Sequence, residues 1–308
     1  MKYNRLVHYL LKPQELVVPI ADHRMLDWLP DEQYLKVLYK GHMGKKLDLN
    51  NPTTYNEKLQ WLKLYDHNPL YKKLVDKYAV KKYVSSKIGK QYVIPTLGIW
   101  ENVNHIPFSE LPEKYVLKCT HDSGSIVICN GKEKFDVSAA KTRLDKYMKH
   151  DFYYVGREWP YKELKHRIIA EEYMEDPVTD ELRDYKFFCF DGKVKAMFIA
   201  TDRQSENRPT AFDFYDADFN HLDIRHGHPN ASVPPQKPEK FELMKYLAEI
   251  LSQGIPHVRV DFYEVAGEVY FGEMTFFHHG GLVPFDPPEW DYTFGKWLKL
   301  PPKSQIID

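Results

Sequence analysis

The sequence predicts an α+β fold, with a helical N-terminal region followed by strands that pair mainly antiparallel. Three observations predict it. Apolar residues such as Leu35, Leu38 and Tyr39 recur at helical spacing between residue 31 and about residue 90. After Tyr92 this spacing gives way to short runs of β-branched and aromatic residues. Two of these runs, 184–190 and 193–200, are joined by Asp191-Gly192, a strong hairpin signal. Antiparallel strands with helices packed on one side are typical of α+β proteins.

The elements are expected in a simple order along the chain. A break with capping residues at 50–54 divides the helical region. The expected strands lie at 115–119, 125–129, 168–174, 184–190, 193–200, 211–215 and 258–276, the last as a hairpin. Further helices are expected at 137–149 and 241–253, the second one capped by Gly254. We therefore expect a helical region at 1–91 and two α+β subdomains at 92–170 and 171–308.

Composition excludes several classes of function. The 43 Lys and Arg residues nearly cancel the 44 Asp and Glu residues, so no global field favours nucleic acid or an anionic membrane. Three cysteines without CxxC spacing argue against a disulfide framework or a zinc ribbon and fit the reducing cytoplasm. No apolar stretch reaches a membrane-spanning length. The basic, partly apolar residues 1–12 leave a weak peripheral membrane contact open.

The segment 258–276 carries one carboxylate on each of two apolar strands, Asp261 and Glu273. A two-residue turn at Ala266-Gly267 would place them on opposite faces, whereas a three-residue loop would make them cross-strand neighbours. Neighbouring carboxylates repel each other, so a positive group should lie between them, and magnesium bound with phosphate suits hard oxygen ligands. The alternative is two solvated acids. If they share a site, the loop must be longer or bulged.

A second polar constellation joins a strand lysine, Lys118, to a turn of small residues with hydroxyl groups. The turn contains Thr120, Ser123, Gly124 and Ser125, whose backbone could approach a phosphate. It lacks the P-loop pattern, and a plain polar hairpin is the alternative. The acids Glu171 and Glu172 lie at the end of another expected strand. The segment 216–220 resembles the start of a calcium loop but lacks the required Gly and Glu. The pairs His226/His228 and His278/His279 lack a third metal ligand in register.

Taken in order, these pieces resemble the ATP-grasp superfamily. The order is the strand lysine with its turn, Glu171-Glu-Tyr-Met174, Asp184-Tyr-Lys186, Arg259-Val-Asp261 and Glu273-Met-Thr275. The sequence segments 51–61, 117–124, 272–276 and 280–285 resemble those of the TupA-like branch, named for teichuronopeptide biosynthesis. The resemblance covers roughly residues 50–297. One departure is Thr275, where many relatives have Asn at the metal.

The resemblance implies ATP and Mg²⁺ bound between a small flap subdomain, 92–170, and a large subdomain, 171–308. It assigns Lys77, Lys118, Thr120, Ser123, Gly124 and Ser125 to the phosphates, and Glu171 or Glu172 with Tyr173 and Met174 to the adenine. The metal ligands would be Asp261, Glu273 and Thr275. The catalytic residues would be Lys186, as the basic residue of the Asp-x-Arg/Lys strand, and Arg203 and Arg259, which would face the transferring phosphate or acyl phosphate.

The implied activity is an ATP-dependent ligase that joins a carboxylate to an amine through an acyl phosphate. In this branch the context would be surface polysaccharide assembly, with an amino acid or amine joined to a uronic acid or a similar small-molecule or saccharide carboxylate. Two alternatives stay open, a glycosyltransferase acting on a nucleotide sugar and a nucleotide-binding module without turnover. The sequence does not name the substrates, the oligomeric state or the number of metal ions.

Overall fold

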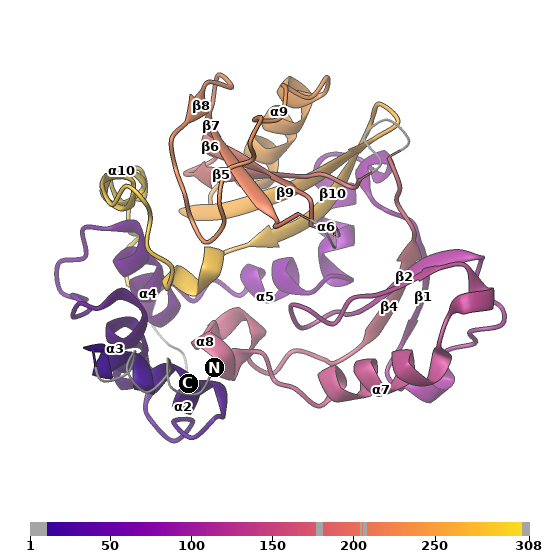
Figure 1. Ribbon diagram of the computed structural model, residues 1–308, viewed down its shortest axis with the longest axis horizontal. Helices are drawn as coiled ribbons and strands as arrows, with labels where there is room; N and C mark the ends of the chain where they lie inside the picture. Colours follow the sequence, from indigo (N-terminus) through magenta and orange to yellow (C-terminus); the bar gives the residue numbers. More distant parts are fainter. Residues whose placement is uncertain (1–10, 177–180, 204, 206–207, 304–308) are drawn as a thin grey trace.

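The computed structural model describes residues 11–176, 181–203, 205 and 208–303 and contains two antiparallel sheets that lie one beside the other (Figure 1). The N-terminal residues 1–10, most of the segment for which a weak membrane contact is expected, lie outside the described residues. No helix in the described part of the chain is long and apolar enough to cross a membrane.

The small sheet has four strands in the order β1-β4-β2-β3, with all neighbours antiparallel. The strands are β1 Thr96–Trp100, β2 Lys114–Cys119, β3 Val127–Asn130 and β4 Ile168–Glu172. One face packs on helix α7 (Val137–Met148) and forms a separate apolar core that includes Leu117, Leu144 and Ala170. Because side chains alternate along a strand, the intervening residues Lys118 and Glu171 lie on the opposite face.

The large sheet has six strands in the order β10-β9-β5-β6-β7-β8. The strands are β5 Asp184–Phe190, β6 Lys193–Thr201, β7 Ala211–Asp216, β8 His221–Leu222, β9 His257–Val265 and β10 Glu268–Thr275. Helix α9 (Phe241–Leu251) packs against β5, β6 and β9. Every residue of β5 is buried, so its charged residues Asp184 and Lys186 lie inside the protein.

The helices of the N-terminal region pack into the core of the large sheet (Figure 1). They are α2 Val17–Asp22, α3 Asp31–Met43, α4 Tyr55–Tyr65, α5 Leu70–Val75 and α6 Ala79–Lys87. Two further helices are α8 Tyr153–Gly156 and α10 Glu289–Trp297. The short 3-10 helices are η1 Pro13–Leu16, η2 Lys90–Tyr92, η3 Val103–His105, η4 Lys132–Lys134, η5 Trp159–Tyr161 and η6 His278–Gly281. Helix α4 begins with a capping box formed by Thr54 and Glu57, within the break expected there.

Most expected elements are found, with a few differences at their ends. Helix α9 ends at Leu251 with Ser252 as its C-cap, so the prediction that Gly254 caps it is wrong. Strand β3 begins at Val127 and not at residue 125, because the Ser125 hydroxyl accepts a hydrogen bond from the backbone N–H of Cys119 and belongs to the turn. The expected boundary between residues 170 and 171 falls inside β4.

Candidate active site

The hairpin β9–β10 brings Asp261 and Glu273 together through a bulge. Its turn has two residues, Ala266 and Gly267, since Val265 pairs with Glu268. The register then shifts between Phe271 and Glu273, which makes Glu273 the cross-strand partner of Asp261. The turn therefore keeps two residues, and the bulge at Gly272 moves Glu273 to the face of Asp261. Of the two arrangements expected from the sequence, a longer loop or a bulge, the hairpin has the bulge.

A single guanidinium group lies between the expected metal ligands. Arg259 Nη2 donates to Asp261 Oδ2 at 2.7 Å, to Glu273 Oε1 at 3.1 Å and to Thr275 Oγ1 at 3.0 Å. Lys186 Nζ donates to the same Asp261 oxygen at 2.5 Å. Asp261 is fully buried, whereas the side chain of Glu273 is 46 % exposed. The positive group expected between the two acids is thus present as a side chain of β9.

Burial and neighbouring charges compete in this cluster. Burial lowers the pKa of the Lys186 ammonium, which Asp261 partly opposes. Burial acts to raise the pKa of Glu273, but Lys186, Arg259 and Lys77 outweigh it and lower that pKa to about 2. Because an opposite charge favours the ionised form, Glu273 stays a carboxylate over the whole physiological range.

The donor set of the hairpin fits a magnesium ion. Two carboxylate oxygens and one hydroxyl oxygen converge within 3.1 Å of Arg259 Nη2, so Mg²⁺ would bind these oxygens in place of the guanidinium group. Hard oxygen ligands are those that Mg²⁺ prefers, and it commonly takes one or two carboxylates and completes its shell with water and phosphate.

Glu171 of β4 pairs with two lysines, Lys118 of β2 and Lys81 of α6. Lys118 Nζ lies 2.5 Å from Glu171 Oε2, and Lys81 Nζ lies 2.5 Å from Glu171 Oε1. Burial acts to raise the pKa of Glu171, but Lys118 and Lys81 lower it. Glu171 therefore holds two cations, while Glu172 is exposed on the other face of the sheet. The structure brings Glu171 to the lysines, and Tyr173 and Met174 follow directly after β4.

The hydroxyl-rich turn after β2 is attached to the segment before α6. The Lys77 backbone N–H donates to Thr120 O, and the Lys77 ammonium donates to the carbonyl of Asp122. The hydroxyls of Thr120 and Ser125 are buried and donate to Asp76 and Asp122, so they shape the turn. Ser123 and Gly124 are exposed at its tip, and Gly124 has a φ of +99°. Only this tip is free to approach a ligand through its backbone.

The cluster continues through Asp184, which lies on β5 beside Lys186. Lys186 Nζ lies 3.4 Å from Asp184 Oδ2, and Arg203, an exposed residue after β6, forms an ion pair with the same carboxylate. Tyr263 of β9 lies within the electrostatic influence of Arg203, Glu273 and Glu171, and burial raises its pKa. Charged groups from both sheets thus act on the pKa of Tyr263.

Three contributors to this cluster were absent from the predicted site, Lys81, Asp184 and Tyr263. One feature of the sequence could have indicated Lys81 as a site residue, because it lies four residues after Lys77, in the first turn of α6. The Asp216-Ala-Asp218 sequence, which a glycosyltransferase could use for metal, instead closes the turn between β7 and β8, because Asp216 Oδ1 accepts from the N–H groups of Asp218 and Asn220.

Comparison with known families shows which family the chain belongs to. The family described as TupA-like ATPgrasp matches residues 57–299. The chain belongs to the TupA-like ATP-grasp family. The expected ATP-grasp fold of this TupA-like protein is thereby confirmed. No curated protein matches the sequence significantly.

Several solved ATP-grasp structures are similar over part of the TupA-like chain. A D-alanine–D-alanine ligase from Bacillus anthracis is 16 % identical, with 66 % of this chain and 57 % of that chain covered and a TM-score of 0.38. The ligase PsnB, complexed with a minimal precursor, is 10 % identical, with 68 % and 54 % covered and a TM-score of 0.39. The D-cycloserine synthetase DcsG is 14 % identical, with 68 % and 64 % covered and a TM-score of 0.38. The chain thus spans less than two thirds of each.

Proposed function

We propose that this protein is an ATP-dependent carboxylate–amine ligase that works through an acyl phosphate. The observation that carries the proposal is the run of charged groups that links the two sheets. On one side it contains Lys77, Lys81 and Lys118, and on the other Lys186, Arg203 and Arg259. Among the described residues, five carboxylates act on these six cations, Asp122, Glu171, Asp184, Asp261 and Glu273, so the cluster keeps a small excess of positive charge for a polyphosphate.

In this proposal the small sheet binds the nucleotide. Lys77 and Lys118 contact the phosphates beneath the exposed tip at Ser123 and Gly124, with Lys81 as a further cation. Lys118 moves from Glu171 to the phosphates when nucleotide binds, because a phosphate offers more negative charge than a shared carboxylate. The adenine lies at Tyr173 and Met174, where the chain leaves β4 for the large sheet.

The large sheet provides the metal and the charge-stabilising groups. Mg²⁺ would be held by Asp261 and Glu273, with Thr275 in direct or water-mediated contact, and it would neutralise charge on the phosphates. Lys186, Arg203 and Arg259 stabilise the negative charge on the transferring phosphoryl group. The substrate carboxylate attacks the γ-phosphorus and releases ADP, and the amine then attacks the acyl carbon and releases phosphate.

This chemistry needs no nucleophilic side chain, and the cysteines fit that requirement. Cys119, Cys129 and Cys189 are all buried and free. Burial raises the pKa of Cys119 and of Cys189 to about 12, so neither is a thiolate at neutral pH. Free cysteines in a core also agree with the cytoplasm as the proposed location.

For the substrates, we propose an amino acid or amine and a uronic acid or similar carboxylate used in surface polysaccharide assembly. A cavity of about 860 Å³ lies beside the cluster, and Arg203 lines both, so a substrate carboxylate bound in the cavity could reach the cations of the cluster. The other two arginines that line the cavity, Arg183 and Arg208, are paired with Glu181 and Asp202. Polar groups suited to a saccharide, such as Asn230 and Ser232, line the same cavity. A weak peripheral contact with the membrane would agree with this context.

The test is a screen for ADP release stimulated by pairs of amino acids and uronic-acid sugars, with product masses measured. A ligase gives ADP, phosphate and a product one water lighter than its two substrates combined. Consumption of a sugar nucleotide without ATP would instead identify a glycosyltransferase. Nucleotide binding without turnover over the whole panel would leave a binding module and would contradict the proposal.

A further inference from the structure

Three histidines that the proposed reaction does not use lie together beside Arg259. His226 comes from the segment after β8, and His278 and His279 come from the turn η6 after β10. The ring centroids of His226 lie 5.0 Å from those of both His278 and His279, which are themselves 4.1 Å apart. His226 and His278 are fully buried, and His279 is partly exposed. Segments more than 50 residues apart thus supply one imidazole cluster.

Each of these rings has one nitrogen without a hydrogen-bond partner among the described residues, Nδ1 of His226 and Nε2 of His278 and His279. Buried polar atoms in native proteins are nearly always paired, so three unpaired ones in one place require an explanation. The other nitrogens are occupied. His226 Nε2 donates to Val283 O at 3.0 Å, and the ring of His279 is hydrogen-bonded to the backbone of His226.

Those two backbone contacts are the kind that prepares an imidazole for a metal. A metal-binding histidine usually donates its second ring N–H to a carbonyl or carboxylate, which leaves the first nitrogen with a free lone pair. Burial also lowers the pKa of His226 to about 3 and that of His279 to about 4, and it lowers the pKa of His278 well below its usual value. The rings are therefore neutral at pH 7, the form that binds metal.

We propose that His226, His278 and His279 bind one divalent transition-metal ion, with Zn²⁺ as the expected ion. One nitrogen of each ring lies within 4.8 Å of those of the other two. Around a tetrahedral Zn²⁺ with Zn–N bonds of about 2.0–2.1 Å these atoms would be about 3.3 Å apart, so modest side-chain rotations close the site. Water takes the fourth position from the side of the partly exposed His279.

His278 binds by shifting its ring proton from one nitrogen to the other. Arg259 Nη1 donates to His278 Nδ1 at 2.6 Å, so the neutral ring carries its proton on Nε2 in the metal-free protein. Coordination at Nε2 needs the other neutral tautomer, so the proton moves to Nδ1 through solvent and His278 gives up its hydrogen bond with Arg259. The ion would tie the segment after β8 to η6 and would release the Arg259 guanidinium group from His278. Nitrogen ligands select Zn²⁺ or Co²⁺, whereas the oxygen ligands Asp261 and Glu273 select Mg²⁺, so the two sites are chemically distinct.

The test uses full-length protein without a histidine tag, treated with a chelator, and titrated with Co²⁺ in excess Mg²⁺. We expect one Co²⁺ per chain, with visible absorption typical of nitrogen coordination. His226→Gln and His279→Gln should weaken binding at least about 100-fold, since each removes a ligand. His105→Gln, an exposed histidine in the small subdomain, is the matched control and should bind normally.

Two further measurements keep the outcome decisive. Glu273→Gln should keep the Co²⁺ signal, because the oxygen site does not hold this ion. Zn²⁺ should raise the unfolding temperature of the wild type but not of His279→Gln, which decides the matter if the more buried His226→Gln fails to fold. No stoichiometric binding, or normal binding by His279→Gln, would overturn the proposal.

Discussion

The two sheets of this protein carry their charges in opposite ways. In the small sheet, the buried Glu171 lies between the partly exposed side chains of Lys118 and Lys81, and the apolar core lies on the other side under α7. In the large sheet, Lys186, Arg259 and Asp261 are buried beside aromatic residues such as Phe198, whose ring lies 5.8 Å from the Arg259 guanidinium group. The cations of the small sheet can change partners at little cost, whereas those of the large sheet are locked together.

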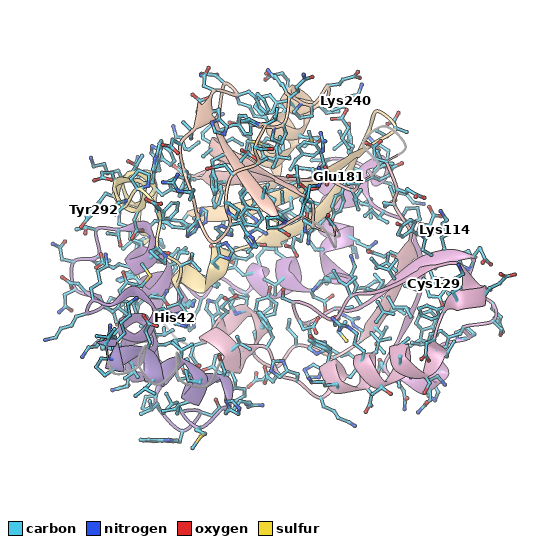
Figure 2. All side chains as sticks on the ribbon, in the orientation of Figure 1. His42, Lys114, Cys129, Glu181, Lys240 and Tyr292 are labelled. Atoms are coloured by element: carbon cyan, nitrogen blue, oxygen red, sulfur yellow. The ribbon has the colours of Figure 1, made fainter. Side chains whose placement is uncertain are left out.

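Figure 2 labels Lys114 and Cys129 in the small sheet and Tyr292 in α10, at the other end of the molecule. Lys114 is exposed and pairs with Glu175. Charges that are buried must be balanced, because removing one partner leaves an uncompensated charge away from water.

Asp261→Asn should lower the free energy of unfolding by about 3–5 kcal/mol, because Lys186 and Arg259 lose their buried counter-charge. Urea unfolding measures the effect, and Glu171→Gln in the small sheet should cost clearly less, since Lys81 and Lys118 can reach solvent. Equal losses in the two variants would remove the distinction between the sheets.

Glu273→Gln should reduce ATP turnover at least about 100-fold, because the proposed metal loses one of its two carboxylates. Its half-exposed side chain makes it a cleaner test of chemistry than Asp261, since the fold tolerates the change better. ADP release at saturating ATP is the measurement. Glu268→Gln, an exposed acid on the same strand, should turn over normally. Undiminished turnover by Glu273→Gln would contradict the metal assignment.

Acidification should destabilise the region around the large sheet through His257. This ring is hydrogen-bonded to the Tyr55 hydroxyl group and to the backbone carbonyl of Cys189, and burial lowers its pKa to about 3. The unfolded chain binds a proton below about pH 6.5 while the folded chain does not, so stability is lost as the pH falls, by about 2 kcal/mol between pH 7 and 5. Urea unfolding of His257→Gln should show a drop smaller by that amount, and His105→Gln should not.

Lys118→Ala should weaken nucleotide binding about 10-fold, because a lysine contributes one charge-assisted contact to the phosphates. Calorimetry with a nonhydrolysable ATP analogue measures the affinity. Lys114→Ala, which removes an exposed lysine from the same strand, provides the control. If the two variants bind alike, Lys118 does not contact the phosphates.

Ala266→Asn should stabilise the protein slightly, by about 0.5 kcal/mol. Ala266 has a φ of +51° in the two-residue turn of the β9–β10 hairpin, and Asn adopts this left-handed conformation more readily than Ala. Thermal unfolding should show a small rise in midpoint. Ala266→Val, with a β-branched side chain, should show a fall, and a rise in both would mean that the turn conformation is not what limits this position.

Much of the fold could be predicted from the sequence because its signals are local. The Asp191-Gly192 turn, the alternation that places Lys118 away from the small core and the helical spacing before residue 90 each depend on near neighbours. The order of charged elements along the chain was enough to indicate the family that the comparison confirms. Helix ends were less certain, as α9 shows, since Ser252 and not Gly254 caps it.

The tertiary structure alone decided how the charges meet. A bulge at Gly272 moved Glu273 to the face of Asp261, although the two-residue turn by itself would have separated them. Lys81 reached Glu171 across two elements, and His226 reached His278 and His279 from a distant segment. These outcomes depend on strand register and on packing between residues far apart in the chain. The sequence by itself determined which groups are present and in what order, and packing determined which of them touch.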